Sequence, residues 1–156
     1  MREYLGIHFN IVLILLLIMA LIQAILFSVN AYADTGELSL EIIGLKNNYG
    51  KVLVNLYQDE DGFPTEPNKA LRQLHVVPMD YKASLIIGNL NVKLEYAIAV
   101  CHDANNNNKC DTNFIGIPLE GVAVSNNAKS FLGPPSFDDA KFLIEKNRHM
   151  TISVNY

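Results

Sequence analysis

Residues 102–111 read HDANNNNKCD, and from Asp103 onward oxygen-bearing side chains recur at alternate positions. Hard cations such as Ca²⁺ take about six to eight oxygen ligands from carboxylates, amides and carbonyls. A tightly curled loop turns alternate side chains inward, so this spacing predicts calcium binding, weak at a Kd on the order of 10⁻⁴ to 10⁻³ M. We call residues 103–111 the Asp/Asn loop. Its candidate ligands are the side chains of Asp103, Asn105, Asn107 and Asp111 and the backbone carbonyl of Lys109.

The Asp/Asn loop departs from the EF-hand pattern. Counted from Asp103, the twelfth position holds Phe114 in place of a bidentate glutamate, and no helical pattern flanks the loop. The alternative is a metal-free loop whose Asp and Asn side chains cap their own turns. In the calcium interpretation, the candidates for a completing carboxylate are Glu120, Asp138 and Asp139.

The first 33 residues predict export. Residues 11–29 are almost wholly apolar, and Ala31, Tyr32 and Ala33 form a small-residue cleavage pattern before Asp34. We therefore interpret residues 1–33 as a signal peptide and expect a periplasmic or secreted protein. The alternative is an uncleaved anchor in the inner membrane, because about 18 or more apolar residues can span a bilayer. In both cases residues 34–156 lie outside the cytoplasm.

Cys101 and Cys110 flank most of the Asp/Asn loop. An exported chain with an even number of cysteines is normally oxidised, so we expect these two to form a disulfide at the base of the loop. Two free thiols are the alternative. Zinc is a weaker alternative to calcium, because Cys101, His102 and Cys110 lack an obvious fourth ligand.

A catalytic site is not expected. The histidines, serines and aspartates of a Ser-His-Asp hydrolase are present, but no Gly-x-Ser-x-Gly context surrounds a serine. A small hydrolase therefore stays an alternative only. Its candidate residues would be His75, His102, His149, Ser125, Ser136, Asp138 and Asp139.

Residues 34–156 have the size of one domain. The chain carries 12 Lys and Arg against 16 Asp and Glu, a net charge of −4, so no basic surface is expected to bind nucleic acid. Short β-rich segments are separated by Gly, Pro, Asn and Asp, which predicts an all-β domain. The expected strands, about seven, are 37–42, 51–57, 74–78, 83–87, 96–101, 141–144 and 150–156.

The expected architecture is a single β-sandwich of immunoglobulin-like or transthyretin-like type. The turn residues at 47–50 predict that 37–42 and 51–57 pair as a hairpin. Residues 103–136 have few strand-like runs but many apolar side chains, so we expect one long, ordered loop excursion. A binding surface on this excursion would be built from Phe114, Ile117, Phe131 and Phe137.

Several linked motifs resemble a bacterial family of small exported proteins known as a domain of unknown function. They are YAIAV at 96–100, HDxNxNxKxDTNFIGIPxEG at 102–121, SNNA at 125–128 and GPPSF at 133–137. Asn106 and Asn108 stand where members of that family often have glycine. The resemblance implies a compact β-sandwich of the prealbumin or carboxypeptidase-regulatory type and an exported location. It implies no particular activity.

These observations together predict a non-catalytic binding or adaptor module of the cell envelope with a calcium-stabilised Asp/Asn loop. Its expected partner is an envelope protein or a small-molecule or glycan ligand, and the membrane is contacted only through an uncleaved N-terminal segment. A purely structural accessory domain without metal is the alternative. The two differ in whether the aromatic side chains of the excursion are exposed or buried.

Overall fold

A computed structural model describes residues 13–23 and 34–156. The chain divides into two compact units, Met1–Ala33 and Asp34–Tyr156. Residues 13–23 are helical. Among the described residues, no helix has both the length and the apolarity needed to cross a membrane. The predicted cleavage pattern at 31–33, like the rest of 1–12 and 24–33, lies outside the described residues.

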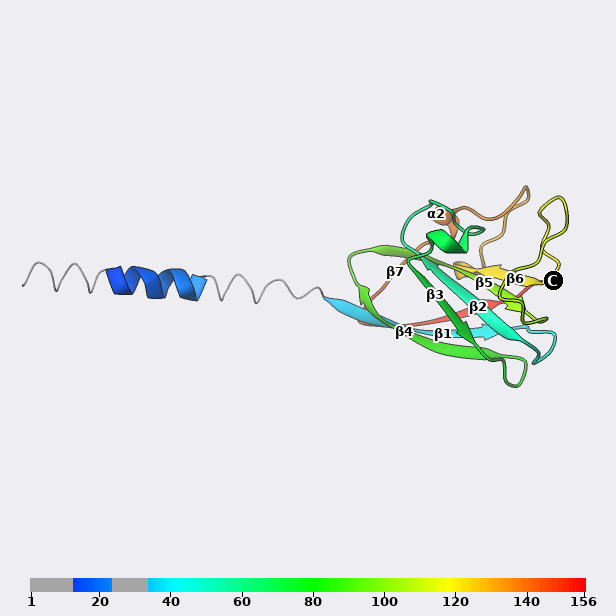
Figure 1. The fold of residues 1–156 in the computed structure, drawn as a ribbon, viewed down its shortest axis with the longest axis horizontal. Helices are drawn as coiled ribbons and strands as arrows, with labels where there is room; N and C mark the ends of the chain where they lie inside the picture. Colours follow the sequence, from blue (N-terminus) through cyan, green and yellow to red (C-terminus); the bar gives the residue numbers. More distant parts are fainter. Residues whose placement is uncertain (1–12, 24–33) are drawn as a thin grey trace, which may run out of the picture. The chain divides into compact units, whose positions relative to one another are not determined.

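The second unit is mostly β, as predicted, and its described residues form eight strands in two sheets (Figure 1). Three short helical turns connect them: η1 (Pro67–Lys69), η2 (Ser125–Asn127) and α2 (Phe137–Ala140). Each of the seven predicted segments overlaps a strand. The strands are β1 (Thr35–Ile43), β2 (Lys51–Tyr57), β3 (Arg72–Val76), β4 (Ala83–Asn91), β5 (Glu95–Asp103), β6 (Gly121–Val124), β7 (Phe142–Leu143) and β8 (Asn147–Ser153).

The one strand that was not predicted, β6, lies inside the segment expected to be a loop excursion. The first sheet has the order β4-β1-β8, and β1 pairs with β8 in parallel. The second sheet has the order β3-β2-β5-β6, with β7 paired to the start of β5. β6 has only four residues and pairs with β5 far along the chain, so its local sequence carried little strand signal.

The predicted hairpin between β1 and β2 is wrong. β1 pairs with β4 and β8, whereas β2 pairs with β3 and β5 in the other sheet. Residues 44–50 therefore carry the chain from one sheet to the other, and Leu45 is buried in that crossing. Buried and less buried residues alternate along both strands. This alternation indicates that one face of a strand points to the core, but it does not indicate which strand is its hydrogen-bonded neighbour.

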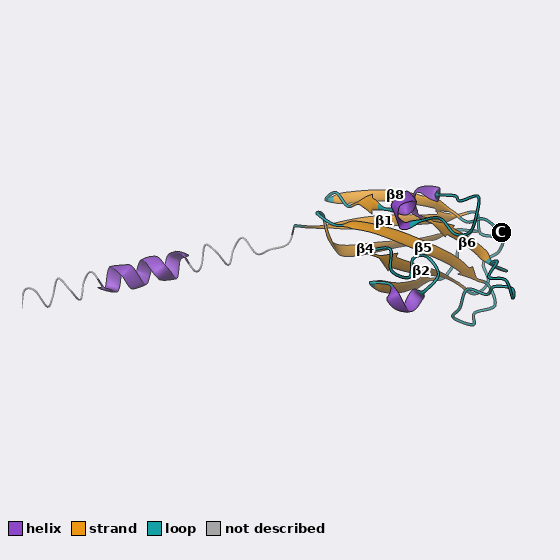
Figure 2. Cartoon of the chain, turned by 90° about the horizontal axis from the view of Figure 1, so that it is seen from above, coloured by secondary structure: helices purple, strands orange, loops and turns teal. Residues whose placement is uncertain are grey.

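The two sheets share one hydrophobic core. Inward-facing side chains of β1, β4 and β8 meet those of β2 and β5, because alternate residues of a strand point to the same face. Figure 2 shows the strands of both sheets running through the domain, with the short helices outside them. The largest side chains of this core that are under 2 % exposed include Leu38, Leu40, Ile42, Leu56, Ile87, Leu90, Ile98, Ile144 and Ile152.

The central strand β5 is buried on both faces. Tyr96, Ile98 and Val100 face the shared core, while Ala97 and Ala99 belong to a second, smaller cluster with Tyr57 of β2 and Ala140 of α2. Burial continues to the end of the strand, where His102 and Asp103 are fully inaccessible to solvent. The Asp/Asn loop therefore starts from an aspartate that is fixed in the protein interior.

The Asp/Asn loop lies at the end of the domain where β1 ends. Lys51, which begins β2, is paired with Asp103, which ends β5. β1 begins at Thr35 and runs toward this end, so the loop is at the far end of the domain from Asp34 (Figure 1). Residues 103–120 project there as a loop that β6 follows.

Candidate functional site

The buried carboxylate of Asp103 organises the Asp/Asn loop. Its Oδ1 accepts a hydrogen bond from the backbone N–H of Asn107 at 2.9 Å, and its Oδ2 accepts one from the N–H of Asn108 at 2.8 Å. Bonds from backbone N–H groups to a charged carboxylate are stronger than those between neutral groups. Asp103 therefore curls the chain back over the end of β5.

The asparagines close successive turns in the same loop. Asn105 Oδ1 accepts from the N–H of Asn107 at 3.1 Å, and Asn107 Oδ1 accepts from the N–H of Lys109 at 2.8 Å. Asn106 and Asn108 have positive φ angles of 62° and 68°, a conformation that asparagine tolerates better than other non-glycine residues. These contacts are those of the metal-free, self-capped loop.

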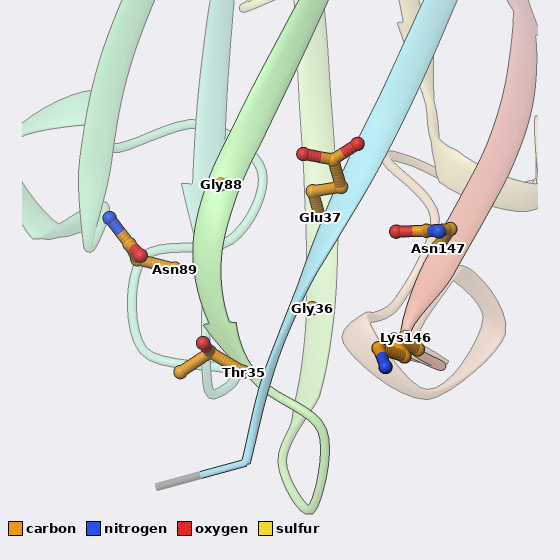
Figure 3. Close-up of a pocket in the computed structure, with 7 residues that line it drawn as sticks. All are labelled: Thr35, Gly36, Glu37, Gly88, Asn89, Lys146 and Asn147. Atoms are coloured by element: carbon orange, nitrogen blue, oxygen red, sulfur yellow. The ribbon is translucent and has the colours of Figure 1, made fainter. Parts of the chain in front are cut away.

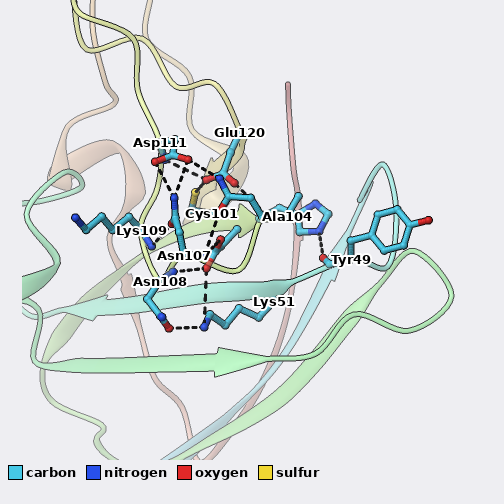
Figure 4. A network of polar contacts seen from close by, with 12 residues as sticks. Tyr49, Lys51, Cys101, Ala104, Asn107, Asn108, Lys109, Asp111 and Glu120 are labelled. Atoms are coloured by element: carbon cyan, nitrogen blue, oxygen red, sulfur yellow. Dashed lines mark hydrogen bonds and ion pairs between the residues drawn. The ribbon is translucent and has the colours of Figure 1, made fainter.

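Asp111 is the point on which the loop side chains converge (Figure 4). Asn105 Nδ2 donates to Asp111 Oδ2 at 2.7 Å. Asn107 Nδ2 lies 3.1 Å from Asp111 Oδ1 and 2.9 Å from Oδ2. The alternate spacing thus brings three of the predicted ligand side chains together. The side chain of Lys109, whose backbone carbonyl was the fifth candidate ligand, points away from Asp111 in Figure 4.

Glu120 is the completing carboxylate that the fold brings to the loop. Its Oε1 accepts from the N–H of Ala104 and its Oε2 from the N–H of Asp111, each at 3.1 Å. Glu120 thereby ties both ends of the Asp/Asn loop together. The other two candidates lie in α2, where Asp138 pairs with Lys141 and Asp139 accepts a bond from Ser136.

Lys51 is a member of the site that the sequence did not reveal. Its Nζ lies 3.9 Å from Asp103 Oδ2 and contacts the side-chain oxygen of Asn108. Its place follows from the pairing of β2 with β5, which joins residues far apart in the chain. The site therefore holds the carboxylates of Asp103, Asp111 and Glu120, of which Asp103 alone pairs with Lys51. This excess of negative charge attracts cations.

The two cysteines are joined at the base of the Asp/Asn loop. Cys101 and Cys110 form a disulfide with their Cα atoms 5.9 Å apart. Among the described residues, these two sulfurs and a Glu120 oxygen also lie within 4.8 Å of one another. Sulfur binds zinc as a thiolate. The disulfide-bonded pair therefore does not supply the ligands that the zinc alternative needs.

His102 is held by contacts that fix its tautomer. Its Nε2 lies 3.0 Å from the carbonyl oxygen of Tyr49, which can only accept, so Nε2 carries the proton. Nδ1 then accepts from the Tyr156 hydroxyl at 2.6 Å. The Tyr156 oxygen in turn accepts from the N–H of Lys46. The imidazole thus fastens the C-terminal residue to the end of the domain.

The serines of the hydrolase alternative serve the fold. The buried Ser125 hydroxyl donates to the Ala140 carbonyl and accepts from the N–H of Ile98, which joins η2, α2 and β5. Ser136 caps α2 by accepting from the N–H of Asp139. In the described part of the chain, neither hydroxyl is hydrogen-bonded to a histidine. His75 and His149 are exposed residues of strands β3 and β8.

Beyond Asp111 the chain forms a compact turn that we call the apolar tip, residues 112–119. Thr112 and Pro118 form a β-bridge, and the N–H of Leu119 bonds to the Asp111 carbonyl at 2.8 Å. Phe114 at its apex is 99 % exposed. Ile115, Ile117 and Leu119 are also exposed, at 64 %, 54 % and 68 %.

The four residues of the predicted binding surface lie in two loop segments and in α2. Phe114 and Ile117 belong to the apolar tip, and Phe131, which is 100 % exposed, lies in the separate segment between η2 and α2. Phe137 is half-buried and packs edge-to-face on Phe63, with ring centroids 5.8 Å apart. Phe137 therefore helps to anchor α2 to the domain.

A shallow pocket lies elsewhere, on the outer side of the β4-β1-β8 sheet (Figure 3). It measures about 230 Å³ and has a polar lining with no aromatic side chain. A Cβ on Gly88 would meet nothing within 4 Å, whereas one on Gly36 would collide with the carbonyl oxygen of Glu145 at 2.3 Å. No motif in the sequence pointed to this pocket. Its lining residues are Thr35, Gly36, Glu37, Gly88, Asn89, Lys146 and Asn147.

Comparison with known protein families shows to which family this chain belongs. The family model DUF2141, described as an uncharacterized protein conserved in bacteria, matches residues 40–153. The chain belongs to the DUF2141 family. The match extends from within β1 to the end of β8, so it contains the Asp/Asn loop, the apolar tip and both sheets of this DUF2141 protein. No curated protein and no solved structure matches the chain.

Proposed function

We propose that this DUF2141 protein is an exported, non-catalytic binding module of the cell envelope. In this proposal the apolar tip contacts the partner, and the Asp/Asn loop binds calcium and holds the tip in place. The domain is an immunoglobulin-like or transthyretin-like sandwich, which is supported by two sheets that share one core. Such a domain presents loops at its ends on a rigid scaffold.

The observation that carries the proposal is the exposure of Phe114 and its apolar neighbours on an ordered turn. Monomeric proteins seldom expose contiguous apolar patches larger than a few hundred Å², and larger patches mark interaction sites. Phe114 is 99 % exposed, although the bridge between Thr112 and Pro118 holds the turn that carries it. A purely structural accessory domain has no use for a rigid apolar tip in water.

The Asp/Asn loop supports the tip physically. The disulfide Cys101–Cys110 and the two hydrogen bonds of Glu120 fix the chain immediately before the tip. Because Asp111 both receives the asparagine amides and bonds to Leu119 through its carbonyl, order in the loop passes to the tip. A binding surface that is ordered in advance loses less conformational entropy when the partner docks.

The calcium part of the proposal rests on charge and convergence. The carboxylates of Asp103, Asp111 and Glu120 belong to one hydrogen-bonded network with a single paired amine, and a divalent cation would offset their repulsion. To bind the ion, the amides of Asn105 and Asn107 rotate so that oxygen faces the Asp111 carboxylate. Their turn-capping bonds are then exchanged for metal contacts.

Export is supported by the leader pattern of residues 1–33 and by the disulfide, which suits an oxidising compartment. We expect the mature chain to begin at Asp34. Intact-mass analysis of the protein purified from the bacterium checks this, and a membrane-bound form that retains Met1 would favour the anchor.

The binding function is tested by site-specific photo-crosslinking in the bacterium that makes the protein. A benzophenone side chain replaces Phe114 in the full-length chain, and the matched control places it at Ile86, which is 66 % exposed on β4. We expect crosslinked products from position 114 and few from position 86. Equal yields at the two positions, or none at 114, would remove the basis of the proposal.

A further inference from the structure

Most backbone N–H groups of the apolar tip are hydrogen-bonded within the loop. The side-chain Oδ1 of Asn113 accepts from the N–H groups of Ile115 and Ile117, at 3.1 and 2.9 Å. The N–H of Asn113 bonds to the Ile117 carbonyl, and that of Gly116 bonds to the Asn113 carbonyl. Backbone donors buried without partners cost several kcal/mol in hydrocarbon. These donors carry no such cost when the tip leaves water.

Among the described residues, the N–H groups of Thr112 and Phe114 have no hydrogen-bond partner. Pro118 has no N–H, and Leu119 donates to the Asp111 carbonyl at 2.8 Å. No side chain in 112–119 is charged, and the residues beyond Asn113 are Phe, Ile, Gly, Ile, Pro and Leu. A charge would resist entry into a low-dielectric medium. The first acidic residues on either side, Asp111 and Glu120, lie outside the tip and limit how far it can enter.

We infer that the apolar tip inserts into the surface of a lipid bilayer. The inference rests on the proposed function, because it names the partner of the same exported binding surface. Phospholipid is then a further class of partner, in addition to the envelope protein, small molecule or glycan expected from the sequence. The ligand chemistry is that of zwitterionic phospholipid, with the Phe114 ring and the aliphatic side chains at the boundary between headgroups and acyl chains.

Lipid fits the tip better than a protein pocket does. Protein interfaces carry about one hydrogen bond per 100–200 Å² and concentrate their energy in Trp, Tyr and Arg, none of which occurs in 112–119. The donors of Asn113, Ile115, Gly116 and Ile117 are already used within the tip. Hydrocarbon requires neither hydrogen bonds nor a matching shape. A Cβ on Gly116 would also meet nothing within 4 Å, so this side of the tip borders open space.

Charge selects the class of lipid. Asp111 and Glu120 flank the tip, and the chain as a whole has a net charge of −4. Anionic headgroups would repel these carboxylates, whereas zwitterionic headgroups would not. The tip lies at the end of the domain opposite Asp34, so the start of the domain leaves it free to meet a surface (Figure 1).

The test uses the domain 34–156, which contains both sheets and the whole described core and therefore folds as a unit. The chain has no tryptophan, so Phe114→Trp introduces a single fluorescent reporter at the apex. Ile86→Trp is the matched control on the exposed face of β4. Both variants are titrated with phosphatidylcholine vesicles, after thermal melts establish that they fold like the wild type.

We expect the emission of Phe114→Trp to move to shorter wavelength and to be quenched by brominated lipid, while Ile86→Trp stays unchanged. In a sedimentation assay, Phe114→Ala should weaken vesicle binding at least about tenfold, the effect of removing one inserted aromatic side chain. Vesicles rich in phosphatidylglycerol should bind less protein in the presence of chelator. A response in both tryptophan variants, or in neither, overturns the inference.

Two further outcomes separate this inference from the proposed function. A blue shift of Phe114→Trp that grows with protein concentration in the absence of vesicles would show a second copy of the chain at the tip and overturn lipid insertion. Crosslinks from position 114 to a protein in cells, together with no vesicle response, would also overturn lipid insertion and leave the binding module intact. Failure of both experiments would remove the proposed function as well.

Discussion

At the scale of single residues, the glycine before β2 is fixed by its contact with the Asp/Asn loop. Gly50 has a φ of +65°, and a Cβ added to it would lie 1.9 Å from the carbonyl oxygen of Asp103. Gly116 in the apolar tip also has a positive φ, +83°, but a Cβ there would meet nothing within 4 Å. An alanine at position 116 would therefore meet backbone strain alone, whereas one at position 50 would meet strain and a steric collision.

We predict that Gly50→Ala destabilises the domain by more than about 3 kcal/mol, because left-handed strain of about 1–2 kcal/mol is added to a collision with backbone. Gly116→Ala should cost only the strain, about 1–2 kcal/mol. Urea denaturation of both variants checks this. Equal losses would mean that the end of β5 moves freely away from Gly50.

Two buried tyrosines differ in what their hydroxyl groups contact. Tyr57 Oη has no hydrogen-bond partner among the described residues, whereas Tyr96 Oη accepts from the N–H of Asn91 at 3.0 Å. Burial, with a smaller effect from the charge of Glu66, raises the pKa of Tyr57 to about 12. Its unfolded pKa is about 10. The neutral tyrosine is therefore favoured by the folded state, and this contribution is complete below pH about 10 and lost as the pH rises through about 12.

We predict that Tyr57→Phe leaves stability at pH 7 unchanged or raises it by up to about 1 kcal/mol, because an unpaired buried hydroxyl is removed. Tyr96→Phe should lose about 1 kcal/mol with its hydrogen bond. Stability curves at neutral pH and between pH 10 and 12 provide the measurement. The alkaline loss of stability should shrink in Tyr57→Phe alone, and a similar loss in both variants would contradict this account.

Local spacing predicted which residues of the site meet, but it could not predict their distant partners. Asp103, Asn105, Asn107 and Asp111 come together because a curled loop joins alternate positions. Lys51 reaches Asp103 only through the register of β2 with β5, which no local pattern encodes.

At the scale of elements, most of the strands could be predicted from the local sequence, but their pairing could not. Alternation predicted β1 and β2 correctly as strands, and the turn residues between them suggested a hairpin. The buried Leu45 instead marks a crossing between sheets, and β1 pairs in parallel with β8 near the C-terminus. Turn chemistry acts over four residues, whereas the choice of sheet depends on burying both strands against the whole core.

The contribution of the disulfide to the free energy of unfolding can be estimated from the length of the loop that it closes. Cys101 and Cys110 are nine positions apart, and closing so short a loop restricts the unfolded chain by about 2.5–3 kcal/mol in the loop-entropy model. We predict that a Cys101→Ser, Cys110→Ser double variant loses about this much stability. Denaturation of the variant beside the oxidised wild type measures the difference. Two thiols that react with a labelling reagent in the unreduced wild type would contradict the bridge.

At the scale of the whole molecule, the alternation of short apolar segments was enough to predict a mostly β domain, and the leader pattern before Asp34 predicted where it begins. The core then fills from both sheets, and the central strand β5 carries the site at its end. Loops at the ends of such a domain can vary while the core is retained. Three of the 16 acidic residues, Asp103, Asp111 and Glu120, meet in the network at this end.

We propose that the Asp/Asn loop is a calcium site that orders the apolar tip, and a thermal melt of residues 34–156 shows whether the ion binds. The protein is stripped with chelator and titrated with calcium, magnesium and zinc. About 10 mM calcium against a Kd of about 0.1 mM stabilises the folded state by roughly 2.7 kcal/mol. For a domain of this size the melting temperature should rise by roughly 10 °C. Magnesium should do much less, because it demands octahedral geometry and dehydrates reluctantly.

The matched variant is Asp111→Asn, which removes one charge at the point of convergence and keeps the shape of the side chain. Asp103 is avoided, because its buried carboxylate holds the loop through two backbone bonds with or without an ion. The account predicts the full shift in the wild type and little shift in Asp111→Asn. A wild-type melt that calcium leaves within about a degree, or a full shift in Asp111→Asn, would contradict it.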